Sequence, residues 1–279
     1  MVRKLLSMRS DTLDLETVIF QLDEASQGAV AVITINRPEA ANALNDVMCR
    51  DLLKVAIACD EDPNIKAVVL TAVSDGIFCA GGDLTIFAQA GDNASAMVKE
   101  MVTFLHGAIT RLARMRPILI TAVNGNAGGA GVSLTAMADL AIAADTAHFT
   151  MAYTRVGLTP DGSSTYFLAR AVGLRRAYDL ALTNRTLSAK EAEDWGLVNR
   201  VVPTPELHNE ALNLARQIAQ GPADSFAATK RLLLDSTVTS LETQLEHEAT
   251  AIANAVGGAE AQEGIKAFLE KRAPNYKDL

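Results

Sequence analysis

The chain has 279 residues, 49% of them hydrophobic and 21% charged, which is typical of a globular protein with ample material for a core. Its formal net charge of −8 argues against the basic surface that a nucleic-acid-binding protein needs, so no nucleic-acid partner is expected. The three cysteines form no C-x-x-C pair and the four histidines are not clustered, which indicates a reducing, cytoplasmic location and no bound metal.

The chain is expected to begin with a flexible tail over residues 1–16, which carry no secretory apolar run. An α/β core is predicted to follow over residues 17–202. It begins with two β-rich runs, 17–22 and 29–35, on either side of a turn at 23–28, a pattern that predicts a β-hairpin.

Helical periodicity and buried β-rich runs then alternate, which predicts an α/β fold with its ligand site at turns after strand ends. Residues 117–138 contain no charged residue, but Pro117 and four glycines interrupt them, so no membrane span is expected. The helices are predicted over residues 45–59, 102–112 and 132–138, and the strands over 65–73, 118–123 and 140–144.

The end of the core is marked by local signals. Ser188 and Glu191 form a capping box at a helix start, and Gly196 is placed to end that helix before a strand at 197–202. Prolines in the segment 203–205 mark a boundary, after which residues 203–279 are predicted to be helical. The four helices are expected over residues 206–220, 223–234, 241–255 and 260–271.

Two glycine-rich turns, at residues 78–84 and 123–131, are the most informative feature. Such turns leave backbone N–H groups uncovered and let a ligand approach closely. Brought together, they can aim two N–H groups at one oxygen and form an oxyanion hole for thioester chemistry. Tight βα packing explains either turn alone. A dinucleotide-binding loop is disfavoured because the spacing is not G-x-G-x-x-G and the motif lies mid-chain.

These turns and several further motifs resemble, in order, those of the crotonase (enoyl-CoA hydratase/isomerase) superfamily, from about residue 18 to 276. The resemblance implies an α/β core built as a spiral of ββα units. It also implies an all-helical C-terminal region that forms homotrimers, usually paired as hexamers. The motifs that carry the resemblance are residues 36–45, 78–84, 117–131, 157–162, 187–192 and 195–198.

The resemblance also implies roles for individual residues. The oxyanion-hole donors would be the backbone N–H groups of Gly82 and Ala130. The two glutamates of hydratases correspond to Ser133 and Tyr153, and neither is a carboxylate. Tyr153 stays a candidate catalytic residue, but a tyrosine with a pKa of about 10 is a poor base at neutral pH. A plain hydratase is therefore disfavoured.

Asp161 is the replacement candidate. The segment 157–162 resembles the one that carries a catalytic aspartate in ring-epoxide isomerases of phenylacetyl-CoA catabolism and in 4-chlorobenzoyl-CoA dehalogenase. His106 matches the catalytic histidine of the dehalogenase by spacing, although its apolar neighbours favour a packed or hydrogen-bonded core histidine. Tyr153 stands where the dehalogenase has a tryptophan that supports its aspartate, which argues against halide displacement.

Coenzyme A is expected as part of the substrate, with no permanently bound cofactor. A basic residue that is common near Ala41 in the family is missing here, so phosphate binding would depend more on Lys271. A solvated helix end explains Lys271 equally well. The positions that the resemblance assigns to coenzyme A are Ala41, Ala43, Leu44, Ala80, Asp83 and Leu84, with Phe268 and Lys271 from the C-terminal helix, often of a neighbouring subunit.

The preferred interpretation is an enzyme that shifts a double bond in an acyl-CoA, with Asp161 carrying the proton. Three alternatives stay open. They are dehalogenase-like attack by Asp161 with His106 activating water, hydration through other residues, and a coenzyme-A-binding pseudoenzyme.

Overall fold

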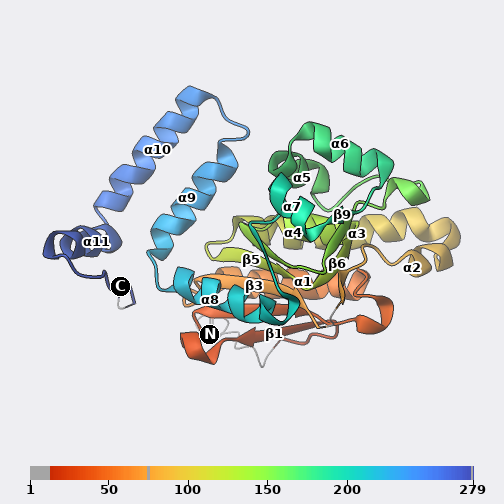
Figure 1. Cartoon of the computed structure of the whole chain (residues 1–279), viewed down its shortest axis with the longest axis horizontal. Helices are drawn as coiled ribbons and strands as arrows, with labels where there is room; N and C mark the ends of the chain where they lie inside the picture. The colour runs from red at the N-terminus through yellow and green to blue at the C-terminus, as the bar shows by residue number, and fades with distance from the viewer. Residues whose placement is uncertain (1–12, 74–75, 278) are drawn as a thin grey trace, which may run out of the picture.

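The computed structural model describes residues 13–73, 76–277 and 279, and two β-sheets form its core (Figure 1). The larger sheet has the strand order β1-β2-β3-β5-β7-β10, and the smaller one has the order β4-β6-β8-β9. The strands are β1 (Val18–Leu22), β2 (Val30–Ile35), β3 (Ala67–Ala72), β4 (Gly76–Cys79), β5 (Ile118–Val123), β6 (Gly125–Gly128), β7 (Leu140–Ala144), β8 (His148–Thr150), β9 (Leu187–Ser188) and β10 (Arg200–Val202).

The chain repeats one unit: a strand of the large sheet, a strand of the small sheet, then a helix. β3 is followed by β4 and α2, β5 by β6 and α4, and β7 by β8 and α5. This repeat confirms the predicted spiral of ββα units. The helices are α1 (Asp46–Glu61), α2 (Leu84–Gln89), α3 (Ala94–Arg114), α4 (Ala130–Ala136), α5 (Ser164–Val172), α6 (Leu174–Thr183), α7 (Ala189–Trp195), α8 (Leu207–Ala219), α9 (Ala223–Asp235), α10 (Leu241–Val256) and α11 (Ala259–Glu270).

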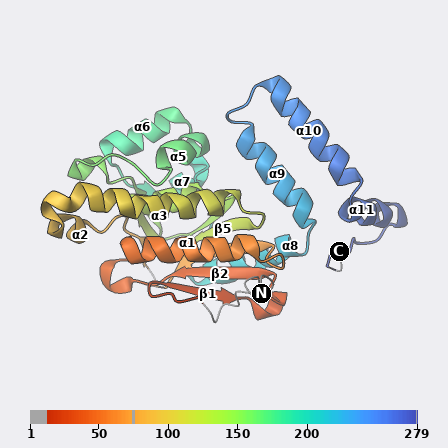
Figure 2. The same ribbon diagram turned by 180° about the vertical axis from the view of Figure 1, so that it is seen from behind.

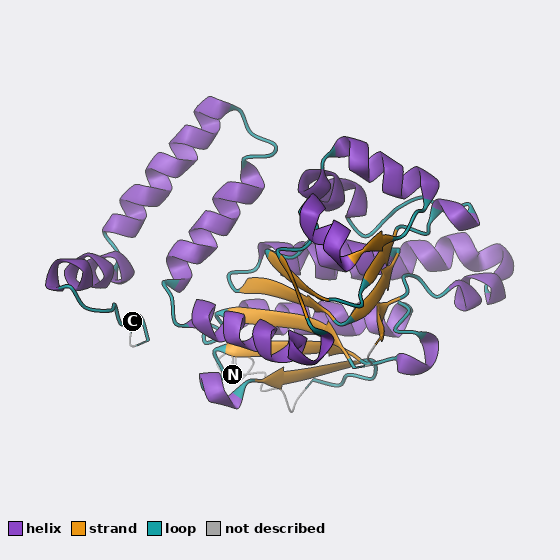
Figure 3. Cartoon of the chain, in the orientation of Figure 1, coloured by secondary structure: helices purple, strands orange, loops and turns teal. Residues whose placement is uncertain are grey.

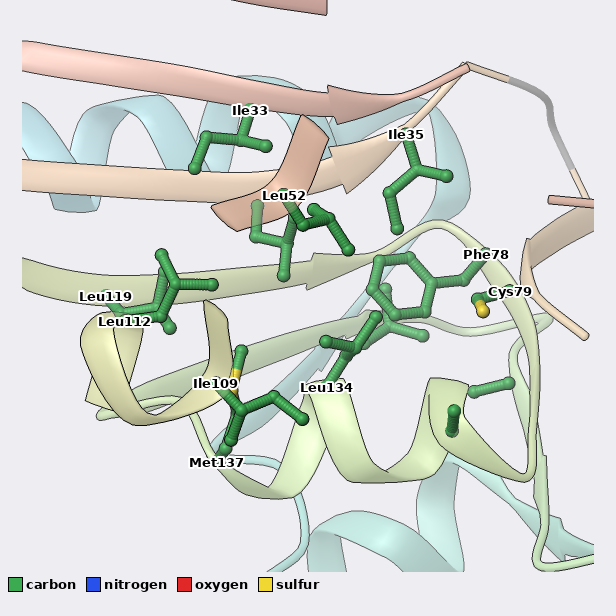
Figure 4. Packing of buried hydrophobic residues seen from close by; sticks show 14 of the residues in the cluster. Ile33, Ile35, Leu52, Phe78, Cys79, Ile109, Leu112, Leu119, Leu134 and Met137 are labelled. Atoms are coloured by element: carbon green, nitrogen blue, oxygen red, sulfur yellow. The ribbon is translucent and has the colours of Figure 1, made fainter. Parts of the chain in front are cut away.

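Helices cover both faces of the large sheet. α1 and α3 pack together on one face (Figure 2), where Phe78 and Leu52 are among the fully buried side chains (Figure 4). α8 covers the other face through Leu207, Ala211 and Ala215. Because both faces are buried, the inner strands are almost wholly apolar, as parallel sheets require.

The predicted hairpin is confirmed, with β1 antiparallel to β2 and Val18 opposite Ile35. The predicted capping box is also confirmed, since the Ser188 side chain accepts from the Glu191 N–H and the Glu191 side chain accepts from the Ser188 N–H. Gly196 ends that helix at φ 82°. The glycine-rich run 123–131 is not only a turn, because it contains β6.

Part of the predicted N-terminal tail is tied to the core. Residues 1–12 lie outside the described residues. The Glu16 N–H donates to Asp51 Oδ2 over 2.9 Å, and Lys54 donates to the Asp14 carbonyl over 2.7 Å, so residues 14–16 are held against α1.

Beyond α8 the chain forms a helical arm of α9, α10 and α11, which projects from the core (Figure 3). A buried Lys230 anchors the arm, donating to Asp139 over 2.7 Å and to the Pro117 carbonyl over 3.1 Å. α10 buries none of its residues, and Leu241, Leu245 and Ile252 are exposed. Within the described residues, none of the helices has the length and apolar character needed to cross a membrane.

Candidate active site

The two glycine turns meet because the strands before them are neighbours. β4 and β6 are parallel and paired, with Cys79 opposite Ala127. The carboxyl ends of parallel strands lie at the same edge of a sheet. The turn that contains Gly81 and Gly82 therefore lies beside the one that contains Gly129 and Ala130, as the sequence predicted.

Glycine is required where these turns approach each other. Gly81 has φ +99°, and a Cβ there would lie 3.1 Å from the Gly128 carbonyl oxygen and 3.5 Å from the Ala130 nitrogen. A Cβ at Gly131 would overlap the Cys79 carbonyl oxygen. Larger residues would force the turns apart and separate the two N–H groups.

The Gly82 and Ala130 N–H groups are both suited to a ligand. Ala130 is the first residue of α4, so its N–H has no acceptor within the helix, and the helix dipole favours negative charge there. Gly82 lies in a short parallel bridge with Leu44. In that bridge the Leu44 N–H donates to the Gly81 carbonyl over 2.7 Å, and the Asp83 N–H donates to the Leu44 carbonyl over 3.0 Å. The bridge therefore does not use the Gly82 N–H.

A cavity of about 370 Å³ opens at these two turns. Gly82 and Ala130 line one end, and α2 and α3 supply an apolar wall. This size and character suit a small apolar group with a few polar contacts. The wall consists of Leu84, Phe87, Val98, Met101, Val102 and Leu105.

Asp161 is the one carboxylate among the described residues that line this cavity, and its side chain is 33% exposed. The Tyr153 hydroxyl donates to Asp161 Oδ1 over 2.8 Å. The Asp161 carbonyl accepts from Ser133 Oγ over 3.2 Å and from Ser164 Oγ over 2.9 Å. The Asp161 carbonyl and Oδ1 are thus held by hydrogen bonds, while Oδ2 accepts none of them.

Tyr153 links Asp161 to the glycine turns. Its ring lies beside Gly129, where an added Cβ would be 3.6 Å from the ring. Burial raises the pKa of Tyr153, and the charge of Asp161 raises it further. Tyr153 is therefore a neutral hydrogen-bond donor at neutral pH, as expected for a residue that is a poor base.

His106 on α3 also reaches this cluster. Its Nε2 lies 3.9 Å from Asp161 Oδ2 and 3.4 Å from the Gly162 N–H, which donates to it. Its side chain is 50% exposed, so the prediction of a histidine packed in the core, which the apolar neighbours favoured, is wrong. The structure thus brings together all three predicted catalytic candidates: Asp161, His106 and Tyr153.

The positions expected to contact coenzyme A divide into three groups. Leu44, Ala80 and Leu84 line the cavity, and Ala41 and Ala43 lie in the adjoining segment 37–44. The Asp83 side chain is instead buried and paired with Arg37. Phe268 and Lys271 lie at or beside the end of α11, at the opposite end of the molecule from α2 (Figures 1 and 2). A single chain therefore does not bring them to the cavity.

Sequence reasoning missed two parts of the site. The sequence does not show that α2 and α3 form an apolar wall, although its α3 residues Val98, Met101, Val102 and Leu105 follow helical spacing. Arg37 was seen only as part of a motif, because nothing in the sequence shows that it pairs with Asp83. Among the described residues no group of three or more His, Cys, Asp or Glu side chains could hold a metal ion.

The chain is similar to known proteins over most of its length. Residues 25–279 match the Enoyl-CoA hydratase/isomerase family. The chain is 36% identical to 1,2-epoxyphenylacetyl-CoA isomerase of Escherichia coli K12 over 92% of this chain and 98% of that protein. It is 32% identical to 4-chlorobenzoyl coenzyme A dehalogenase-1 of an Arthrobacter species, over 87% of this chain and 88% of that protein.

Solved structures give the same result. An enoyl-CoA hydratase from Polaromonas sp. JS666 superposes with a TM-score of 0.88 at 31% identity, covering 93% of this chain and 99% of that one. The α/β spiral, the paired glycine turns and these matches define a crotonase-fold protein. The chain belongs to the enoyl-CoA hydratase/isomerase family.

Proposed function

We propose that this protein is an acyl-CoA isomerase that shifts a carbon–carbon double bond through a thioester enolate. The observation that carries the proposal is the position of Asp161 at the same cavity as the Gly82 and Ala130 N–H groups, with no second carboxylate among the described lining residues. Moving one proton needs one base, whereas alkene hydration needs groups both to activate water and to deliver a proton.

The proposed reaction has two proton transfers. Asp161 Oδ2 removes a proton from the substrate carbon next to the thioester or at the far side of the double bond. The electrons move onto the thioester oxygen, and the Gly82 and Ala130 N–H groups stabilise that oxyanion. The protonated Asp161 then returns the proton at the other carbon, so the double bond moves and no atom is gained or lost.

The proposed substrate is a coenzyme A thioester with an apolar acyl group, with no permanently bound cofactor. The apolar side chains of Phe87, Val98 and Met101 support this, because they form one wall of the cavity. Arg155 is the one basic side chain among the described lining residues, and it donates to the Asn184 carbonyl over 2.9 Å. A homotrimer, or a hexamer of two trimers, is proposed as the assembly because α10 exposes apolar side chains with no cover in the chain itself.

The test is turnover of a 3-enoyl-CoA by Asp161→Asn. The variant should lose turnover by roughly a thousandfold or more while keeping its affinity for the coenzyme A thioester, because the amide preserves shape and removes the base. Asp194→Asn is the matched control, since Asp194 is an exposed aspartate that pairs with Lys190 on the surface. Unchanged turnover by Asp161→Asn would rule out the proposal.

The second candidate is dehalogenase-like hydrolysis, which the 3.9 Å separation of His106 Nε2 and Asp161 Oδ2 favours. Asp161 would displace halide from an aromatic ring and form an aryl ester, which water would then hydrolyse. Turnover in oxygen-18 water separates the two, because label enters the Asp161 carboxylate only if that ester forms. A hydratase would instead give a 3-hydroxyacyl-CoA, and a pseudoenzyme would bind the thioester without any product.

A further inference from the structure

We infer that Arg37 is a positioning residue that holds the Gly82 N–H in place for the oxyanion hole. Arg37 lies 45 residues before Gly82 in the sequence and does not line the cavity. Its role would be to lock together the two backbone segments that carry Gly82. The inference rests on the proposed function of Gly82 as an oxyanion donor.

The turn with Gly82 is held by a neighbouring segment of backbone. The Ala80 N–H donates to the Ala41 carbonyl over 3.1 Å. The Leu44 N–H donates to Gly81 over 2.7 Å, and the Asp83 N–H donates to Leu44 over 3.0 Å. Residues 41–44 therefore act as a strap along residues 80–83, and the position of Gly82 depends on this strap.

Arg37 is the side chain that joins the strap to the turn. One guanidinium nitrogen, Nη1, donates to Asp83 Oδ2 over 2.7 Å and to the Ala43 carbonyl over 3.0 Å. The Arg37 N–H donates to Asn42 Oδ1 over 2.9 Å, which fixes the base of the strap. The contacts of Arg37 thus reach both the residue after Gly82 and the residue before Leu44.

Asp83 connects the ion pair with Arg37 to the start of α2, directly after Gly82. It is the N-cap of α2, and its Oδ1 accepts from the Thr85 N–H over 3.1 Å and the Ile86 N–H over 3.4 Å. Its other oxygen accepts from Arg37. Asp83 therefore has both oxygens occupied, which fixes the residue after Gly82. The Gly82 N–H belongs to the peptide that joins Gly81 to Gly82, and the carbonyl of that peptide accepts from the Leu44 N–H over 2.7 Å. Its orientation therefore depends on the strap, which Arg37 joins to Asp83.

The ion pair between Arg37 and Asp83 is largely buried, so water cannot easily replace either partner. The side chains of Arg37 and Asp83 are only 16% and 10% exposed. A buried ion pair contributes little net stability, but loss of one partner leaves the other charge unpaired. Arg37 also keeps a fixed fork of donors that lysine lacks.

The direct test reads the polarisation of a bound thioester. Octanoyl-CoA labelled with carbon-13 at the carbonyl contains no double bond, so it reports the oxyanion hole without reacting. Difference infrared spectra should show the thioester carbonyl stretch moved to lower wavenumber on binding to the wild type. Arg37→Gln should give a clearly smaller shift. With a 3-enoyl-CoA, its kcat should fall roughly tenfold or more with little change in KM, because one donor is misaligned rather than lost.

The chain offers a matched control. Arg216 binds the cap aspartate Asp23 over 2.7 and 2.9 Å, and Asp23 accepts from the Ser26 N–H, so the arrangement resembles that of Arg37 but lies outside the site. Arg216→Gln should show the wild-type carbonyl shift and kcat. If Arg37→Gln does not fold, Asp83→Asn replaces it, because asparagine keeps the helix cap and removes the charge.

The possible results distinguish the role of Arg37 from the proposed function. A wild-type carbonyl shift and kcat in Arg37→Gln and Asp83→Asn would overturn the inference. Independent, additive losses in the double variant would overturn it too, because the effect would not pass through the pair. A carbonyl shift in the wild type without isomerase activity would defeat only the proposed function. Absence of any shift in the wild type would defeat the oxyanion hole and the inference together.

Discussion

Tyr153 and Asp161 are joined by a hydrogen bond of 2.8 Å from the tyrosine hydroxyl to Oδ1 of the carboxylate. This bond orients the carboxylate and leaves Oδ2 as the oxygen that faces His106. In the proposed mechanism, Tyr153 would hold the base in place rather than act as the base.

Tyr153→Phe should lower kcat of the proposed isomerase by about tenfold, because the carboxylate loses the donor that fixes its orientation. The loss should be much smaller than that of Asp161→Asn. Tyr166→Phe is the control, since its hydroxyl contacts Thr237 away from the site and its removal should leave kcat unchanged. A Tyr153→Phe enzyme with wild-type steady-state kinetics would show that the bond has no role in turnover.

His106→Ala separates the two enzymatic interpretations. His106 Nε2 lies 3.9 Å from Asp161 Oδ2, close enough for a water between them but too far for a direct hydrogen bond, so an isomerase would depend little on it. In an isomerase we expect kcat to fall by less than about tenfold, and in a dehalogenase by a factor close to that of Asp161→Asn. Rates for a 3-enoyl-CoA and a 4-halobenzoyl-CoA should be measured with both variants. A severe loss of isomerase activity in His106→Ala would assign it an unexpected role in proton transfer.

The sequence predicted the glycine turns and Asp161 because each is a local signal. It could not reveal β6, since a strand that includes Gly125 and Gly128 has little β-propensity. The reason for that composition is long-range: a Cβ at Gly125 would overlap the backbone of Gly76 on the neighbouring strand. The partner of Arg37 likewise depends on chain pairing across 46 residues, which no local pattern encodes.

The place of Lys271 depends on a level of structure that one chain does not contain. The lysine ends α11 at φ 54°, far from the cavity, so any contact with coenzyme A must come from a neighbouring subunit. Lys271→Ala should weaken coenzyme A thioester binding severalfold by calorimetry, with a weaker effect at high salt. Lys266→Ala on the same helix is the control. Equal affinity of the wild type for a free acid and its coenzyme A ester would contradict the proposed substrate class.

The exposed face of α10 gives a test of assembly. Leu245 and Ile252 are 53% and 63% exposed. Leu245 lies about one turn after the exposed Leu241, and Ile252 lies about two turns after Leu245, so the three share one face of the helix. A charge placed on an apolar interface is strongly unfavourable. Leu245→Asp should shift the mass measured by light scattering from a trimer or hexamer towards a monomer or aggregate, and Glu246→Gln on the same helix should not. A wild-type protein that is a well-behaved monomer would contradict the proposed assembly.

The Asp83 carboxylate should also contribute to stability in a pH-dependent way. Although burial opposes its charged form, the hydrogen bonds from Arg37 and the Ile86 N–H hold the pKa of Asp83 below its usual value of 3.8. A carboxyl whose pKa is lower in the folded state than in the unfolded state stabilises the fold above the unfolded pKa. That stability is lost as the pH falls through the lowered pKa.

Asp83→Asn should therefore lower the free energy of unfolding by about 1.5–3 kcal/mol near neutral pH, the range for a hydrogen bond to a charged group. The difference from the wild type should shrink as the pH is lowered through 3.8 and below, because the wild-type carboxyl then becomes neutral as well. Urea unfolding followed by circular dichroism at a series of pH values measures both quantities. Asp194→Asn is the control, because Asp194 is exposed and its ion pair with Lys190 should contribute little. A difference between Asp83→Asn and the wild type that stays constant from neutral to acid pH would mean that the charge on Asp83 does not contribute to the stability of the fold. The interaction with Arg37 would then act through shape alone.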